Sequence, residues 1–426
     1  MHSSLFVILV DALRYDYINE IDTPFLFERI QKDALYCKHL KTVNGYNQRT
    51  VICTGADETV TNTFSMYNID NKNSPFNFKG FDKKYNILNF VKYITTNLWL
   101  KNRIENRINT HKNVLRKKLI EDAKKSCFYP NLSYIPLEIV NHISMGEDNR
   151  SPIDKNGFNA ESIFDILKEY NIDFEYLMYP IYILDDNEVQ KKLLSEKGLK
   201  NKFILAQFSN VDFIGHQFGP NSYERKIAMG EIDRKIRELY TTIGEKSNFI
   251  IFGDHGMTAV NKTVNINSII EQSNQLIKAK HGKDYISFLD STIFRFKILN
   301  EKGDELLQKI KVNNEIVSSG KDYTEYLYKI MNNEKISSKL YGDYFWKANI
   351  GSLIHPDYFH AINDCNKGMH GYGAEHSDMD SLIIGFGPKF SKKVIENASL
   401  YDICPTICSA LSIRKPNKSI GKNLLD

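Results

Sequence analysis

The sequence predicts an α/β fold in which a central, mostly parallel sheet is sandwiched by helices. Short apolar runs such as residues 5–10 (LFVILV) and 249–252 (FIIF) are typical of strands buried on both faces of a sheet. Amphipathic, helix-like stretches alternate with these runs, as expected for parallel strands joined by crossover helices. Several runs end in Asp or His, and parallel sheets bind ligands at the carboxyl ends of their strands.

Two helices near the N-terminus have recognisable ends. Thr23-Pro24 opens a helix over residues 26–30, because Pro is favoured in the first helical turn. Gly55 ends a short helix over residues 47–54, since Gly adopts the left-handed conformation that closes helices.

The remaining elements follow from periodicity and residue type. The other predicted strands are residues 36–40, 174–178, 203–208 and 381–385. The other predicted helices are residues 162–170, 225–240 and 402–413.

Composition excludes several classes of protein. The chain has 426 residues, 42% of them hydrophobic and 25% charged, which are ordinary globular values. A net charge of +4 gives no reason to expect binding to a nucleic acid polymer. The six cysteines form no CxxC pair, which favours a reducing, cytoplasmic compartment over disulfides or a thiolate zinc site. The first apolar run is shorter than the core of a signal peptide, and no stretch reaches the length of a membrane span.

Two regions break the alternation of strands and helices. Residues 82–126 hold twelve Lys or Arg against four Asp or Glu, with aromatic side chains interspersed, and are predicted to form a basic helical insertion. Residues 260–367 lie between two motif clusters and are predicted to form a small α+β cap. The catalytic core then comprises residues 1–81, 127–259 and 368–426.

Four short motifs collect Asp and His residues that suit metal binding. They are Asp11 after LFVILV, Asp212 and His216 in NVDFIGHQFGP, Asp254 and His255 in FGDHGM, and His370 in GMHGYG. We expect all of them at strand ends or in Gly-rich loops, where a parallel sheet gathers its site. Three carboxylates and three imidazoles suit two divalent metal ions, with zinc favoured and manganese or iron as alternatives.

These motifs resemble those of the alkaline phosphatase superfamily, and most closely its nucleotide pyrophosphatase/phosphodiesterase-like branch. VILVDALRYDYI followed by TPFL is similar to the opening strand and helix of that branch. NVDFIGHQFGP, FGDHGM and GMHGYGAEHSDMDSLIIGFGPKF resemble its metal-binding motifs, and LYDICPTICSALSI resembles its closing helix. The motifs occur in the family's order over nearly the whole chain.

The resemblance implies a division of the six ligands between two metals. It assigns Asp212, His216 and His370 to metal one, and Asp11, Asp254 and His255 to metal two. It also implies in-line attack on phosphorus by a metal-activated Ser or Thr, followed by hydrolysis of the phospho-enzyme.

The segment that should carry this nucleophile departs from the family pattern. Gly45-Tyr46 is followed by Asn47, where relatives place Ser or Thr, and counting back from Thr54-Gly55 also reaches no hydroxyl. Three interpretations remain open. Asn47 occupies the slot and faces metal two, or Thr50 is the nucleophile, or Thr42 is.

If no hydroxyl serves, a metal-bound hydroxide attacks directly, or the protein is a non-catalytic metal-binding pseudoenzyme. Gln48 and Arg49 are expected to bind the phosphate oxygens of the substrate, because Arg favours bidentate contacts with anions.

The sequence thus predicts a two-metal phosphohydrolase that cleaves phosphodiester or pyrophosphate bonds. A phospho-alcohol transferase or a phosphomonoesterase is the alternative within enzymes. The expected substrate is a small phosphate ester or a lipid- or glycan-linked phosphate. The basic residues 82–126, with their interspersed Trp and Tyr, predict either peripheral contact with a membrane or a solvated face packed on the core. Nothing in the sequence sets the oligomeric state.

Overall fold

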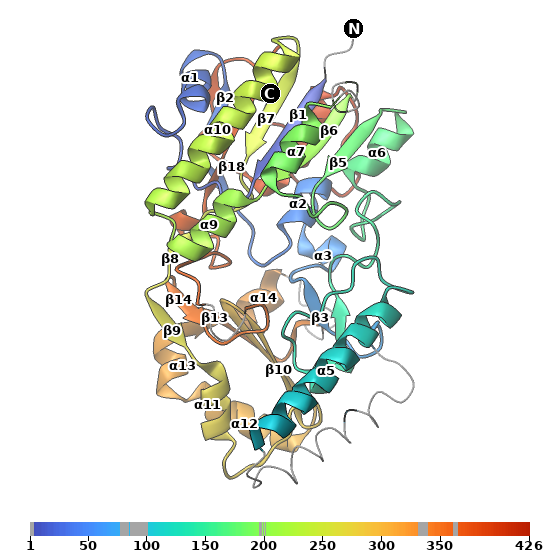
Figure 1. Cartoon of the computed structure of the whole chain (residues 1–426), viewed down its shortest axis with the longest axis vertical. Coiled ribbons are helices and arrows are strands. Elements are labelled where there is room, and N and C mark those ends of the chain that lie inside the picture. Colours follow the sequence, from blue (N-terminus) through green and yellow to red (C-terminus); the bar gives the residue numbers. More distant parts are fainter. Residues whose placement is uncertain are drawn as a thin grey trace.

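The computed structural model describes residues 4–76, 85, 101–195, 198, 200, 202–330, 340–360 and 365–426. The molecule is elongated, with a large sheet and its helices at one end and a smaller sheet at the other (Figure 1). The strands of the large sheet are, in spatial order, β17 (Lys393–Val394), β2 (Leu35–Lys41), β16 (Ser381–Phe386), β7 (Asn248–Phe252), β1 (Leu5–Val10), β6 (Phe203–Phe208) and β5 (Phe174–Leu177), and β18 (Ala398–Ser399) pairs with β2.

The large sheet is mostly parallel, as predicted, with β16 as its antiparallel member. Successive residues of β1 point to opposite faces, so the apolar run is buried on both sides. Leu5, Val7 and Leu9 pack with one group of helices, namely α2 (Gln48–Thr54), α6 (Ile163–Glu169) and α16 (Ile403–Ala410). Phe6 and Ile8 pack with the group on the other face, namely α1 (Pro24–Lys32), α7 (Asp186–Leu193) and α10 (Tyr223–Ile243).

The smaller lobe is built on an antiparallel sheet with the order β10 (Tyr285–Asp290), β11 (Ile293–Ile298), β13 (Tyr344–Ala348) and β12 (Gly320–Asp322). Its helices are α11 (Ile266–Ser273), α12 (Glu301–Lys311), α13 (Asn314–Ser319) and α14 (Thr324–Ile330). One hydrophobic cluster joins β10, β11, β13 and the helices α11, α12 and α13 to α5 (Lys101–Ala123) and to the hairpin of β3 (Tyr67–Ile69) and β4 (Ile143–Met145).

The division into a core and two insertions stays a prediction. Within it, residues 82–126 contain helix α5, and residues 260–367 contain both helices and strands. In the structure, α5 and the β3–β4 hairpin pack against the smaller lobe. Six apolar residues of the predicted basic insertion lie outside the described residues, namely Phe90, Tyr93, Ile94, Leu98, Trp99 and Leu100.

The remaining elements are short. They are the strand pairs β9 (Lys262–Val264) with β14 (Ser352–Ile354) and β8 (Thr258–Ala259) with β15 (Gly368–Met369), the helices α3 (Glu58–Thr61) and α9 (Asn210–Phe218), and the 3₁₀ helices Leu137–His142, Ser377–Met379 and Leu400–Asp402. Among the described residues, no helix is both long and apolar enough to cross a bilayer.

Helix α9 is the main difference from the sequence prediction. We expected Asp212 and His216 at a strand end or in a Gly-rich loop, but both lie on this helix. Gly215 obscures the helical pattern, and it packs closely against the buried side chain of Met257, which would have to shift for any larger residue. A Cβ atom there would lie 2.6 Å from the sulfur of Met257.

Candidate metal centre

Asp11 and Asp254 are brought together by neighbouring parallel strands. Leu9 of β1 lies beside Phe252 of β7, and each Asp follows the end of its strand. The backbone N–H of Ala12 donates to Asp254 Oδ1 at 3.3 Å, which ties the two strand ends together. The predicted convergence of carboxylates at this sheet edge is therefore present.

Asp212 and His216 come from α9, which follows β6, the other neighbour of β1. They are four residues apart and so lie on one face of the helix. His216 Nε2 lies 3.3 Å from Asp212 Oδ1. The helix thus presents a carboxylate and an imidazole as one unit beside Asp11.

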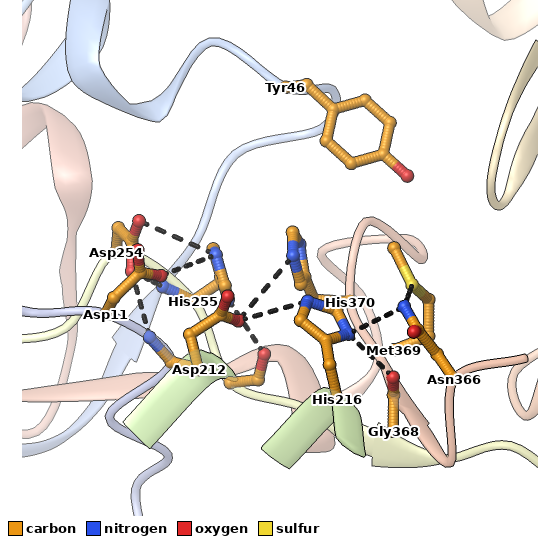
Figure 2. A network of polar contacts seen from close by, with 12 residues as sticks. Asp11, Tyr46, Asp212, His216, Asp254, His255, Asn366, Gly368, Met369 and His370 are labelled. Atoms are coloured by element: carbon orange, nitrogen blue, oxygen red, sulfur yellow. Dashed lines mark hydrogen bonds and ion pairs between the residues drawn. The ribbon is translucent and has the colours of Figure 1, made fainter. Parts of the chain in front are cut away.

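His370 follows β15, whose pairing with β8 places it next to the segment that carries His255. His370 Nε2 lies 3.8 Å from Asp212 Oδ1. His255 Nε2 lies 3.4 Å from Asp11 Oδ1 and 3.5 Å from Asp254 Oδ2. Figure 2 shows the six side chains in one row, with Asp212 between the two halves.

Hydrogen bonds behind these side chains fix their orientation. His216 Nδ1 lies 2.8 Å from the carbonyl oxygen of Gly368, and His255 Nδ1 lies 3.0 Å from that of Gly256. Each Nδ1–H can donate to its carbonyl, which leaves Nε2 with a lone pair that points into the site. Gln207 Nε2 donates to Asp11 Oδ2 at 2.7 Å and holds that carboxylate in place.

The carboxylates of the cluster are buried close together, and the protein alone does not balance their negative charge. Burial raises the pKa of Asp11 well above its usual range, and the nearby carboxylates of Asp254 and Asp212 raise it further. Burial also raises the pKa of Asp254, although His255 opposes the shift. Burial and the neighbouring His255 depress the pKa of His370. A divalent cation would favour ionised carboxylates and neutral imidazoles together.

Two sets of donor atoms lie close enough to hold a metal ion. Asp212, His216 and His370 form one set, and each donor atom lies within 4.8 Å of the others. The second set contains Asp11 and His255 with Asp212, whereas the resemblance assigned Asp254 to that position. Asp212 Oδ1 is buried and accepts no hydrogen bond from the described residues, which fits a metal ligand that serves both halves.

The side chains of Asn47 and Thr50 are directed elsewhere. Asn47 precedes α2 and is fully buried, and its amide donates to the carbonyl of Thr63 at 2.8 Å. The hydroxyl of Thr50 forms a short hydrogen bond with the carboxylate of Glu147. Thr42 donates its hydroxyl to the backbone carbonyl of Asp254 at 2.8 Å. Of these three residues, Thr42 is the one that contacts a candidate metal ligand, Asp254.

Gln48 and Arg49 do reach the metal side. They line a cavity of about 330 Å³ together with Asp11, Asp254 and Gln207. Within it the Gln48 amide donates to the carbonyl of Gly45 at 3.0 Å.

The guanidinium of Arg49 is held by carboxylates. It donates to Glu147 Oε2, to Asp148 Oδ1 at 2.7 Å and to the carbonyl of Tyr179 at 3.0 Å. Burial raises the pKa of Asp148 to about 6, against the effect of Arg49. Arg49 therefore brings N–H donors to the cavity wall, while its charge is matched by these two carboxylates.

Sequence reasoning missed Gln207, Glu147 and Asp148. A polar residue in the strand FILAQF was a usable signal for Gln207, because its neighbours are apolar. Glu147 and Asp148 lie nearly a hundred residues from Arg49 in the chain, and no local pattern links them to it.

Comparisons with known proteins agree with this geometry. In curated sequences, the chain is 24% identical over 251 residues to the alkaline phosphatase PafA of Elizabethkingia meningoseptica, covering 53% of this chain and 45% of the relative. It is 25% identical over 327 residues to ectonucleotide pyrophosphatase/phosphodiesterase 1 of Saccharomyces cerevisiae, covering 67% and 41%. It is 28% identical over 232 residues to ectonucleotide pyrophosphatase/phosphodiesterase family member 7 of Rattus norvegicus, covering 49% and 47%. The chain thus spans less than half the length of these relatives.

Among solved structures, murine ectonucleotide pyrophosphatase/phosphodiesterase 5, as an inactive variant in complex with AMP, matches with a TM-score of 0.64 at 15% identity. The match covers 97% of this chain and 96% of that one, and it supports a common fold. The family model described as type I phosphodiesterase/nucleotide pyrophosphatase matches residues 83–372. The chain therefore belongs to the type I phosphodiesterase/nucleotide pyrophosphatase family.

Proposed function

We propose that this protein is a two-metal hydrolase of phosphodiester or pyrophosphate bonds. The observation that carries the proposal is the row of Asp and His side chains in which Asp212 lies between two sets of donor atoms. Two divalent ions, when bound, would stabilise charge on the attacking and leaving oxygens of a phosphoryl transfer. The mixed carboxylate and imidazole donors favour zinc, with manganese or iron as alternatives.

The substrate phosphate is proposed to bind in the cavity lined by Gln48 and Arg49. Both side chains carry N–H donors at the wall that also contains Asp11 and Asp254. The relative solved with AMP gives a precedent for a small phosphate ester at such a site. Lipid- or glycan-linked phosphates extend the same chemistry to larger leaving groups.

For the nucleophile, we propose that Asn47 does not act covalently and that Thr50 is not free to act. An amide is a poor nucleophile, and the Thr50 hydroxyl is bound to Glu147. Thr42 is the third candidate, and its hydroxyl contacts the candidate metal ligand Asp254.

The test is hydrolysis of bis-p-nitrophenyl phosphate by purified protein loaded in turn with zinc, manganese or iron. We expect turnover that a chelator abolishes and that the best-fitting metal restores. Bound metal without turnover would favour the non-catalytic alternative.

A phosphomonoesterase is the second candidate, because one of the similar curated proteins is an alkaline phosphatase. Parallel assays with p-nitrophenyl phosphate decide between the two. A higher kcat/KM for the monoester would favour this second candidate.

We also propose that the protein works in a reducing, cytoplasmic compartment. None of the six cysteines forms a disulfide in the structure, and five of them are buried. Fractionation of the source cells tests this proposal, and recovery of the protein from the exterior would refute it.

A further inference from the structure

A second cavity opens on the other side of the cluster, beside His216 and His370. Its volume is about 200 Å³. Most of its wall surface is apolar. Besides the two His residues, the walls are formed by Tyr46, Met66, Phe359 and Met369 and by the polar residues Ser65, Ser291, His360 and Asp290. It is separate from the cavity that contains Gln48 and Arg49, although Tyr46 and Met66 contribute to both.

Asp290 is the charged group of this cavity. It ends β10 and its side chain is 1% exposed. Arg295 Nη2 lies 2.9 Å from Asp290 Oδ2, while Arg295 Nη1 donates to the carbonyl of Tyr67 at 2.8 Å. The guanidinium also lies over the ring of Phe288, 4.4 Å from its centroid. The carboxylate is therefore fixed in position from behind.

The other carboxylate oxygen has no such partner. Asp290 Oδ1 is buried and accepts no hydrogen bond from the described residues. A buried acceptor left unpaired is destabilising, so a partner is expected from outside the protein. Burial raises the pKa of Asp290 to about 6, against the effect of Arg295, and the group is mostly ionised at neutral pH.

The balance of charge indicates what kind of partner would fit. Arg295 already matches the negative charge of Asp290, so the pair does not call for a cation. The unpaired oxygen needs a hydrogen-bond donor, and the apolar walls suit a short carbon skeleton. The volume is below the roughly 300 Å³ typical of the smallest drug-sized pockets, which favours a small polyol over a whole nucleoside.

We propose that this cavity binds the alcohol part of the phosphate ester and that Asp290 accepts a hydrogen bond from a hydroxyl group on it. Asp290 would thereby determine specificity for polyol phosphates. The inference rests on the proposed function, because it takes the phosphate to lie at the metal cluster next to His216 and His370.

The experiment compares two phosphates that differ in their hydroxyl groups. Isothermal titration calorimetry with the metal-loaded protein gives Kd values for glycerol 3-phosphate and for propyl phosphate. We expect glycerol 3-phosphate to bind about tenfold more tightly, as one hydrogen bond to a charged acceptor allows. Equal affinities in the wild-type protein would overturn the proposal, as would failure of both phosphates to bind.

Variants then test whether the preference for glycerol 3-phosphate depends on Asp290. Asp290→Asn should reduce it to about threefold or less, whereas Asp304→Asn, an exposed carboxylate in the same lobe, should leave it intact. If Asp290→Asn does not fold because Arg295 loses its partner, Ser65→Leu fills the cavity, removes only the 3.5 Å hydrogen bond from Ser65 to Asp290 Oδ2 and keeps the ion pair with Arg295; it should also abolish the preference. A folded variant of either kind that keeps the full preference would refute the role of Asp290. Since binding needs no turnover, loss of hydrolysis with an intact preference would refute the proposed function alone.

Discussion

His255 and His370 lie face to face, with ring centroids 3.8 Å apart and ring planes inclined by 13°. Each belongs to a different set of donor atoms, so the stack joins the two halves of the cluster. Two protonated imidazoles would repel at this distance, and burial together with His255 depresses the pKa of His370 well below its usual value. His370 is therefore neutral at physiological pH, which is the form that binds metals.

The first prediction concerns His255. His255→Ala should lower metal content and turnover together, by at least about 10–100-fold in metal affinity, because even residues behind the ligands have effects of that size. Metal analysis and bis-p-nitrophenyl phosphate hydrolysis measure the two effects. His111→Ala, at an exposed position of α5, is the control. Full metal occupancy in His255→Ala would exclude this residue as a ligand.

The second prediction concerns Gln207, which supports Asp11 through a 2.7 Å hydrogen bond. Gln207→Leu keeps a similar volume but removes the donor. We expect metal affinity to fall about tenfold while the fold is retained. Competition with a chelator of known affinity provides the measurement, and Gln272→Leu on the exposed side of α11 is the matched control. Unchanged affinity would mean that the hydrogen bond does not position Asp11 for the metal.

The third prediction concerns Asn47 and Thr50. Because Asn47 cannot form a phosphoester and Thr50 is bound to Glu147, the wild-type protein should accumulate no phospho-enzyme at either position. Thr50→Val should change kcat by no more than about threefold, through loss of one hydrogen bond. Asn47→Thr should neither increase turnover nor permit a trapped phospho-enzyme, because the side chain at this position is buried and directed toward the carbonyl of Thr63.

Mass spectrometry of acid-quenched reactions checks the third prediction. A phosphate mapped to Thr50 in the wild-type protein, and lost in Thr50→Val, would contradict it. A phosphate mapped to Thr42 would identify the residue that touches Asp254 as the nucleophile.

The fourth prediction concerns the basic helix α5. If residues 82–126 contact a membrane, the protein should sediment with anionic vesicles at low salt and dissociate at high salt, since exposed charges are screened over about 8–10 Å. The double variant Arg107→Glu and Lys117→Glu reverses two exposed charges of α5 and should weaken this binding. Absence of vesicle binding at low salt would leave α5 as a helix that packs on the smaller lobe.

The fifth prediction concerns acid stability. Burial acts to raise the pKa of Glu138, but His281, whose Nδ1 lies 3.7 Å from Oε1, and a 2.7 Å hydrogen bond from Tyr85 outweigh it and lower the value to about 2. A depressed carboxyl pKa stabilises the fold above the unfolded value near 4.5, and this contribution is lost as pH falls toward 2. Glu138→Gln should lower Tm by about 1–3 °C at pH 6 and have no effect near pH 2. A difference in Tm that is constant with pH would contradict this assignment.

By itself, the sequence determined six strands of the large sheet, the approximate positions of five of the helices that cover it, and the identity of six candidate ligands. Apolar runs and capping residues are local signals, and they predicted β1, β6 and β7 within one residue of their observed bounds. Asp11 and Asp254 were predictable as neighbours because parallel strands place their carboxyl ends at one edge.

Only the tertiary structure decided how the ligands are grouped and what supports them. Asp212 reaches both sets of donor atoms because α9 is a helix, and the glycine that allows its close packing had hidden the helical pattern. Arg49 and Thr50 pair with Asp148 and Glu147, which are nearly a hundred residues away in the chain. Asp290 pairs with Arg295 across the hairpin of β10 and β11. Such contacts depend on the packing of whole elements, which no short stretch of sequence encodes.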